Sequence, residues 1–202
     1  VITGGTLVQP DGTLDASIAI DDGTIVAFGE RSDLPDAETT VDATGQLVMP
    51  GAVDVHVHLD DMFSNDTYGT ASRAAALGGT TTFIDFAWQA WVSESSIFDE
   101  ESTLFEGIER KQAKAEDSMI DYSLHGAITR EDPEVLDELP KIINEGVTSI
   151  KMFTAYEFGI SNGFINEVFQ EAAGHDLVAV LHTEESSICE VITEAQKRQG
   201  KG

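Results

Sequence analysis

The stretch PGAVDVHVHLD, residues Pro50–Asp60, carries the pattern from which the fold of the chain is predicted. We interpret the apolar run Val53–Val57 as a buried strand that ends in His56 and His58. Side chains two positions apart on a strand point to the same face, so both imidazoles project to one side and offer two nitrogen ligands to one metal ion. Taken alone, the pair is equally compatible with two structural histidines, so the rest of the chain has to decide.

The composition is strongly acidic. The chain has 202 residues, 41% of them hydrophobic, which is typical of a globular protein with a sizeable core. It carries 37 acidic against 11 basic residues, a net charge of −26. A field this negative repels phosphate groups, so we expect neither nucleic acid nor a membrane as a partner. Acidic residues spread over the whole chain are also typical of proteins that work in high salt, and we expect a halophilic source; an ordinary acidic cytosolic protein is the alternative.

The single cysteine bears on the compartment. Cys189 cannot form an internal disulfide, which fits a reducing cytoplasm, and we interpret it as a partly buried helix residue rather than a catalytic thiol. The sequence also contains no apolar run long enough to cross a bilayer and no signal-peptide pattern at its start. We therefore expect a cytoplasmic protein.

The chain divides into two regimes. Residues 1–50 contain short strand-like runs separated by turns such as Pro10–Gly12 and Asp21–Gly23, which predicts a small all-β module. Strands and helices alternate over residues 51–202, which predicts parallel β/α crossovers in a doubly wound sheet or a barrel. No glycine-rich phosphate loop follows the first strand, which disfavours nucleotide binding. The expected strands are 53–57, 80–86, 121–128, 149–153 and 177–182, and the expected helices 68–77, 98–116, 133–145, 164–173 and 186–199.

Two further residues fall at strand positions that matter for a site. Lys151 lies within the apolar strand SIKMF, and His182 ends the strand that follows. In a parallel barrel the carboxyl ends of all strands open onto one face, so we expect these residues to lie near His56 and His58. A bare ammonium inside an apolar strand is costly unless it is paired or chemically altered. The alternative is a lysine whose tip reaches solvent or an acidic partner.

Four segments together resemble a known family. The runs PGAVDVHVHLD, AALGGTTTFIDF, IKMFTAY and LHTEE occur in an order and at separations similar to those of the hydantoinase and dihydropyrimidinase branch of the amidohydrolase superfamily. The resemblance covers nearly the whole chain. It implies a (β/α)8 TIM-type barrel, of which about five β/α units are present in residues 51–202. It also implies that residues 1–50 form the N-terminal part of a β-sandwich module.

The resemblance also implies a binuclear metal site. His56 and His58 would bind one divalent ion, usually zinc in this family, and His182 would bind the second. Lys151 would be carboxylated by carbon dioxide, and the resulting carbamate would bridge the two ions. Tyr156 would stabilise the oxyanion during catalysis; a packing residue at the rim of the site is the alternative for this tyrosine. Lys151 and Tyr156 are therefore the expected catalytic residues.

The implied reaction is hydrolysis of a C–N bond in a cyclic amide or ureide, a dihydropyrimidine or hydantoin type of ring opening, by a hydroxide that bridges the metals. The family also needs a histidine on the sixth strand and an aspartate after the eighth, which would lie beyond Gly202. We therefore expect an N-terminal fragment that is inactive by itself. For the complete protein we expect a homo-oligomer. The alternatives are a non-catalytic assembly protein of the same superfamily and an allantoinase or dihydroorotase type of ureide hydrolase. Asp60 and Asp61 stand where dihydroorotases typically carry an arginine, which favours uncharged rings.

Three other polar residues have open roles. Asp54 either orients a metal ligand or is a buried, hydrogen-bonded carboxylate. For His125, in the expected strand 121–128, we favour a structural role. His175, next to Gly174 at a helix end, is expected to be exposed.

Overall fold

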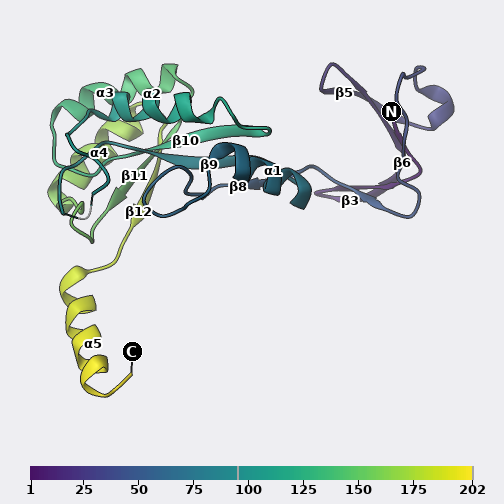
Figure 1. The fold of residues 1–202 in the computed structure, drawn as a ribbon. Coiled ribbons are helices and arrows are strands. Elements are labelled where there is room, and N and C mark those ends of the chain that lie inside the picture. The colour runs from purple at the N-terminus through teal and green to yellow at the C-terminus, as the bar shows by residue number, and fades with distance from the viewer. Residues whose placement is uncertain (95, 202) are drawn as a thin grey trace. The chain divides into compact units, whose positions relative to one another are not determined.

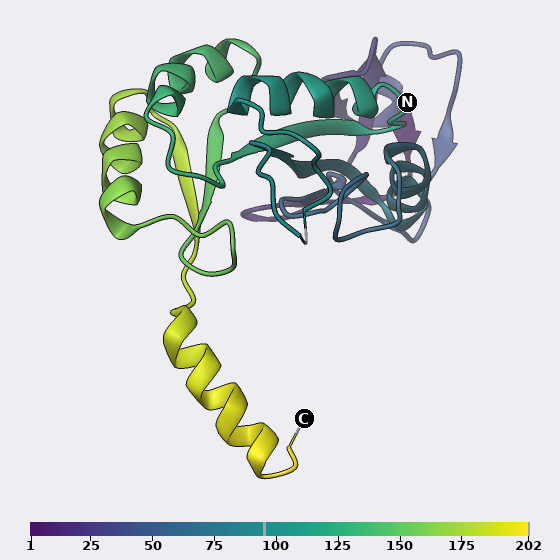
Figure 2. The ribbon, with the colours of Figure 1, turned by 60° about the vertical axis from the view of Figure 1, so that its left-hand side comes forward.

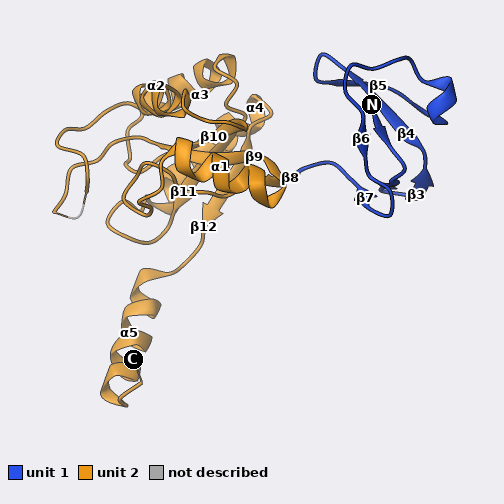
Figure 3. Cartoon of the chain, turned by 45° about the vertical axis from the view of Figure 1, so that its right-hand side comes forward, with its two compact units in different colours: residues 1–51 blue, residues 52–202 orange. Residues whose placement is uncertain are grey.

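The computed structural model describes residues 1–94 and 96–201, which form two compact units, Val1–Gly51 and Ala52–Gly202 (Figure 3). The first unit consists of two small sheets with strand orders β5-β4-β1-β6 and β3-β2-β7. The β4–β5 hairpin turns through Asp22 and Gly23, both with positive φ (46° and 73°), the conformation of the two-residue turns whose twist matches that of paired strands. The elements of this unit are β1 Ile2–Thr3, β2 Thr6–Gln9, β3 Gly12–Asp15, β4 Ser17–Asp21, β5 Thr24–Gly29, η1 Arg31–Asp33, β6 Val41–Asp42 and β7 Leu47–Val48.

The second unit is built on a five-stranded sheet in the order β12-β11-β10-β9-β8, in which every neighbouring pair is parallel (Figure 1). Successive strands lie side by side, and each connection between them contains one helix, which is the repeating arrangement of a β/α barrel. The predicted α/β class with parallel β/α units is therefore confirmed. The elements are β8 Ala52–Asp54, α1 Tyr68–Gly78, β9 Thr80–Trp88, α2 Leu104–Ala115, β10 Asp121–Ala127, α3 Glu134–Asn144, β11 Ser149–Phe153, α4 Asn162–Gly174, β12 Val178–His182 and α5 Ser186–Arg198.

Local signals explain where α1 and α2 begin. Thr67 accepts a hydrogen bond from the backbone N–H of Thr70, and Thr103 does the same for Glu106, each pair forming a reciprocal capping box. The sequence prediction of a helix from residue 98 was therefore too long at its start, because Thr103 caps α2. At the other end of α1, Gly79 adopts the left-handed conformation (φ 88°) that ends the helix and leads into β9.

The two faces of the sheet have different surroundings. Ile150 and Met152 of β11 pack with α2, α3 and α4 in the largest core cluster, and these helices cover that face (Figure 2). Lys151 and Phe153 alternate with them and point to the opposite face. There, Phe153 joins a hydrophobic cluster, rich in aromatic residues, whose buried members also include Phe86, Trp88, Trp91, Ala127 and Phe158. The period-2 alternation along each strand therefore separates a structural core from a cavity wall.

The prediction for the first strand of the second unit was wrong in detail. We expected a buried strand over residues 53–57, but β8 comprises only Ala52–Asp54, and Val53 and Val55 are exposed. β8 is the edge strand of the sheet, and its pairing with β9 is interrupted by a register shift between Ala52 and Val53. The chain continues alongside β9, since the N–H of Val57 donates to the carbonyl oxygen of Ile84 at 3.1 Å. His56 and His58 therefore follow the strand rather than ending it.

The last helix, α5, lies outside the buried core of the second unit. The prediction of a partly buried Cys189 was wrong, because this residue is exposed on α5, a helix that buries none of its side chains within the described chain. No helix among the described residues combines the length and the apolar character that crossing a membrane requires.

Candidate active-site cavity

A cavity of about 670 Å³ opens at the carboxyl ends of the parallel strands of the second unit. The segment after β8 contributes the two histidines, β11 contributes Lys151, β12 contributes His182, and the connection after β11 contributes Tyr156. All five residues predicted for the site are thus brought together, although they come from segments up to 126 positions apart (182 − 56). The remaining lining residues are Met62, Phe63, Phe86, Trp88, Phe153, Glu157 and Phe158.

The two histidines of the His-x-His motif lie against one aromatic ring. Their ring centroids are 5.3 Å apart, and the ring of Phe86 lies 4.6 Å from His56 and 4.7 Å from His58. Burial, and next the nearby His58 and Lys151, lower the pKa of His56. The neutral imidazole, which is the form that binds metal ions, is therefore favoured at neutral pH.

Lys151 is a buried lysine whose ammonium lies between aromatic rings. The residue is 5% exposed, and its Nζ atom lies 5.2 Å from the ring centroid of Phe153 and 6.0 Å from that of Phe86. Across residues 1–94 and 96–201 this ammonium has neither a hydrogen-bond nor an ion-pair partner, so the alternative of an acidic partner finds no support. Burial lowers the pKa of Lys151, which increases the fraction of neutral, nucleophilic amine.

Tyr156 and His182 face each other across the cavity rim. The Tyr156 hydroxyl lies 3.3 Å from Nε2 of His182, and the same nitrogen lies 3.2 Å from a carboxylate oxygen of Glu184. Tyr156 has a positive φ of 69°, a conformation that costs a bulky residue about 1–3 kcal/mol and is concentrated at functional sites. Burial, and next the Glu184 carboxylate, raise the pKa of the Tyr156 phenol, so the hydroxyl keeps its proton and is able to donate a hydrogen bond at neutral pH.

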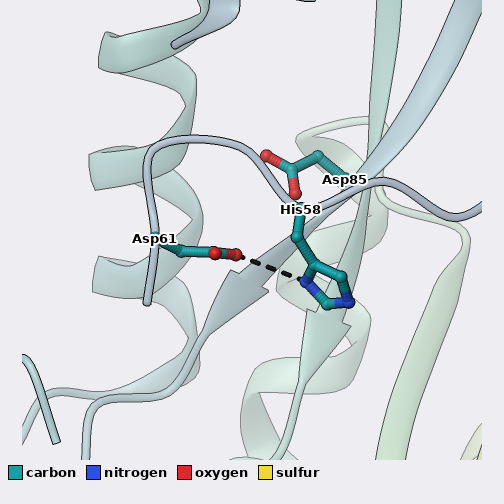
Figure 4. Close-up of side chains that lie close together, drawn as sticks. All are labelled: His58, Asp61 and Asp85. Atoms are coloured by element: carbon teal, nitrogen blue, oxygen red, sulfur yellow. Dashed lines mark hydrogen bonds and ion pairs between the residues drawn. The ribbon is translucent and has the colours of Figure 1, made fainter. Parts of the chain in front are cut away.

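A polar cluster that the sequence analysis missed lies directly behind His58 (Figure 4). Nδ1 of His58 is 3.3 Å from Oδ2 of Asp61. One ring nitrogen of His58 and one carboxylate oxygen each of Asp61 and Asp85, the atoms that could bind a metal ion, lie within 4.8 Å of one another. Between the two carboxylates lies the ammonium of Lys111, 2.9 Å from Asp85 and 3.8 Å from Asp61. One signal for Lys111 was present in the sequence, because this lysine falls on the apolar stripe of α2 that also contains Leu104, Ile108 and Ala115.

The other polar residues named from the sequence have simpler surroundings. His125 is buried, with Nδ1 2.6 Å from the Ser149 hydroxyl and Nε2 2.9 Å from the Val55 carbonyl oxygen, which agrees with a structural role. His175 lies on the surface, 3.0 Å from Glu171. Asp54 is exposed, not buried, and accepts a hydrogen bond from the backbone N–H of His56 at 3.1 Å.

A sheet of successive parallel β/α units with polar residues gathered at the carboxyl ends of its strands is the arrangement of a (β/α)8-barrel enzyme. Comparison with known protein families makes the assignment specific. Residues 47–201 match the Amidohydrolase family, and the chain belongs to this family.

Similar proteins agree on one branch of the family. The chain is 35% identical over 212 residues to a D-hydantoinase of Streptomyces coelicolor, a match that covers 100% of this chain and 44% of the relative. It is 32% identical over 190 residues to a D-phenylhydantoinase of Escherichia coli K12, covering 91% of this chain and 39% of the relative. Among solved structures, a D-hydantoinase matches with a TM-score of 0.87 at 32% identity, covering 99% of this chain and 43% of the other. A dihydropyrimidinase of Brevibacillus agri NCHU1002 matches with a TM-score of 0.85 at 31% identity and the same coverage. The predicted resemblance is confirmed, and the chain spans less than half the length of these relatives.

Proposed function

We propose that the complete protein hydrolyses a C–N bond of a cyclic amide or ureide ring, of the dihydropyrimidine or hydantoin type, with the help of two divalent metal ions. One observation carries the proposal: His56, His58, His182 and the buried Lys151 line a single cavity at the strand ends of a chain that belongs to the amidohydrolase family. The relatives named above are hydantoinases and a dihydropyrimidinase, which supports this substrate class.

The residues of the cavity suit metal ions as ligands. Imidazole nitrogens are preferred ligands of zinc, and carboxylate oxygens complete many zinc sites. We propose that His56 and His58 hold one ion and that His182 holds the other. Nδ1 of His182 has no hydrogen-bond partner in the described part of the chain, whereas Nε2 lies near Tyr156 and Glu184.

Lys151 is proposed to supply the bridging ligand after reaction with carbon dioxide. The lone pair of the neutral amine forms the new N–C bond, one C=O pair moves onto oxygen, and the amine loses a proton, which leaves a carbamate anion with two oxygen donors. The lowered pKa of Lys151 favours this reaction, as does its lack of a hydrogen-bond or ion-pair partner among residues 1–94 and 96–201. The carbamate also removes the cost of a bare ammonium beside two aromatic rings.

In the reaction, bound divalent ions supply Lewis-acid polarisation of the carbonyl and lower the pKa of water from 15.7 to about 7. The protein supplies position and a hydrogen-bond donor. The Tyr156 hydroxyl is directed at the cavity, where it donates to the carbonyl oxygen as negative charge develops on it. The aromatic wall formed by residues such as Phe86, Trp88 and Phe153 excludes water and accommodates a flat ring.

The cavity lining favours an uncharged ring over one that carries a carboxylate. None of the described lining residues is an arginine, and Glu157 adds negative charge to the rim. A substrate carboxylate would therefore lack a bidentate partner. This supports a hydantoin or dihydropyrimidine over a dihydroorotate type of substrate.

The cellular setting is part of the same proposal. We place the protein in the cytoplasm, on the ground that its one cysteine is unpaired. The net charge of −26 supports a salt-adapted protein without nucleic-acid or anionic-membrane partners. A homo-oligomer remains our expectation for the complete protein, to be tested by light scattering.

The decisive experiment replaces the bridging lysine in the complete protein, expressed from its natural gene. We expect Lys151→Ala to lose bound metal and to open neither hydantoin nor dihydrouracil, with partial recovery when a short carboxylic acid is added to mimic the carbamate. Lys141→Ala, on the exposed side of α3, serves as the matched control and should behave as the wild type. Full activity of Lys151→Ala without added acid contradicts the bridging role. A wild-type protein that holds no stoichiometric metal contradicts the enzyme proposal and favours a non-catalytic assembly protein.

A further inference from the structure

The ammonium of Lys111 lies between the carboxylates of Asp61 and Asp85, where a metal ion could otherwise bind. The residue is 5% exposed, and its ammonium contacts Asp85 at 2.9 Å, Asp61 at 3.8 Å and the carbonyl oxygen of Leu59. Asp85 is fully buried and also accepts hydrogen bonds from the Tyr68 hydroxyl at 2.8 Å and the N–H of Phe86 at 2.7 Å. An additional metal ion held by His58, Asp61 and Asp85 would have to displace this ammonium, because Lys111 already supplies a positive charge between the two carboxylates.

Asp61 connects this buried cation to His58. Its Oδ2 atom lies 3.3 Å from Nδ1 of His58 and accepts a hydrogen bond from the indole N–H of Trp88 at 3.2 Å. Its Oδ1 atom accepts a hydrogen bond from the backbone N–H of Phe63 at 2.8 Å. An ionised carboxylate only accepts hydrogen bonds, so the contact assigns the proton of the neutral imidazole to Nδ1. The lone pair of His58 is then on Nε2, the nitrogen that is left for a ligand in the cavity.

We propose that Asp61 and Lys111 are positioning residues for metal binding: Lys111 holds the Asp61 carboxylate in place, and Asp61 fixes the tautomer and the orientation of His58. The inference rests on the proposed function in so far as His58 is a metal ligand. It goes further by assigning roles to Asp61, three residues after that histidine, and to Lys111 on α2. Neither residue belongs to the proposed set of metal ligands.

The neighbouring lysine of α2 shows what a merely anchoring contact looks like. Lys114 donates to the backbone carbonyl oxygen of Asp60 at 2.8 Å, and the Asp60 carboxylate accepts the N–H of Tyr68 at 3.0 Å. Both contacts hold the turn after the histidines, where Asp60 has a positive φ of 51°, but neither reaches an imidazole. Lys114 and Asp60 therefore provide matched controls for Lys111 and Asp61, each with the same chemical change in the same segment.

The test uses the complete protein, stripped of metal with a chelator and titrated with zinc in competition with a chromophoric chelator. We expect Asp61→Asn and Lys111→Met to bind zinc about 10- to 100-fold more weakly than the wild type, because partners that orient a ligand typically contribute this much to affinity. Asp60→Asn and Lys114→Met should bind zinc as the wild type does. Equal losses in the control variants overturn the proposal, since the effect would then come from loosening the loop.

A double-mutant cycle separates the two links. If Lys111 acts through Asp61, Lys111→Met should weaken zinc binding far less in the Asp61→Asn background than in the wild type. Additive effects overturn the role assigned to Lys111.

The tautomer of His58 gives a readout that needs neither zinc nor a stable Lys111 variant. In the metal-free wild type, ¹⁵N spectra of histidine, assigned with His58→Gln, should show the proton on Nδ1 of His58. A proton on Nε2 overturns the role of Asp61 even if the Asp61 and Lys111 variants fail to fold. If the wild type binds no zinc but carries the proton on Nδ1, the proposed enzymatic function fails while the link between Asp61 and His58 stands.

Discussion

Replacing Tyr156 by phenylalanine removes a single hydroxyl from the rim of the cavity and should reveal whether that hydroxyl stabilises an oxyanion. The hydroxyl lies 3.3 Å from His182, and its raised pKa keeps the proton available for donation. Loss of one oxyanion donor typically lowers kcat by about 10²- to 10³-fold, which corresponds to about 2.7–4 kcal/mol of transition-state stabilisation. The side chain is 55% exposed, so the same hydroxyl contributes at most about 1 kcal/mol to folding. Activity should therefore fall without a comparable fall in stability.

The assay measures kcat and KM for ring opening of hydantoin and dihydrouracil, together with the melting temperature, in the complete protein. KM should change little, because the hydrogen bond is made mainly in the transition state. Tyr122→Phe is the matched control, since that tyrosine is partly exposed on β10 and its ring contacts Tyr68, at a centroid distance of 5.8 Å, instead of the cavity. A kcat of Tyr156→Phe within about threefold of the wild type, a difference of less than 1 kcal/mol, would refute the assignment.

Three further predictions concern the fold and its electrostatics. The buried Glu138 of α3 accepts the first two N–H groups of α2, at 2.9 and 3.2 Å, so Glu138→Ala should lower the free energy of unfolding by about 2–3 kcal/mol in urea titrations. The exposed neighbour Asp137→Ala should cost far less, and similar losses for both would contradict the capping role. Raising KCl from 0.15 to 1 M shortens the screening length from about 8 to about 3 Å and so weakens the repulsion among the charges of this chain, whose net charge is −26. The melting temperature should therefore rise with KCl, and an unchanged or lower value would argue against salt adaptation. Glu131 accepts the N–H of Ser161 at 2.7 Å, and this hydrogen bond lowers the pKa of the Glu131 carboxyl from the ordinary 4.5. The contribution of the bond to stability is therefore present above pH 4.5 and is lost as the pH falls through the lower pKa of the folded state. The Ser161 amide signal in NMR should accordingly shift with a midpoint below pH 4.5, and a midpoint at or above 4.5 would contradict the prediction.

Much of the site followed from the sequence because one rule of parallel sheets does most of the positioning. Lys151 and His182 lie on neighbouring strands whose carboxyl ends open onto the same cavity, as the alternation of strands and helices indicated. The rule worked less well for His56 and His58, because an edge strand with a register shift ends earlier than its apolar pattern suggests. His56 and His58 nevertheless line the same cavity as Lys151 and His182, since the segment after β8 stays alongside β9.

The cluster behind His58 could not be predicted with the same rule. The contact between Asp61 and Lys111 joins a loop to a helix 50 positions further along the chain (111 − 61), and neither strand alternation nor helix periodicity fixes how those two elements meet. Asp61 was read from the sequence only as a feature that disfavours an acidic substrate. In the structure, the Asp61 carboxylate accepts hydrogen bonds from Trp88 and from the backbone of Phe63, and these bonds hold it next to His58.

The two buried lysines show why burial alone does not reveal function. Lys111 and Lys151 are equally inaccessible, each 5% exposed, yet only one of them is charge-compensated. Lys111 has two carboxylates and a carbonyl oxygen around its ammonium, so removing these partners would leave an unpaired buried charge. The ammonium of Lys151 faces two aromatic rings and has no such partner in the described part of the chain, and its lowered pKa favours the neutral amine. The partners of each lysine therefore separate a residue whose charge is paired within the fold from one whose surroundings suit the carboxylation that we propose.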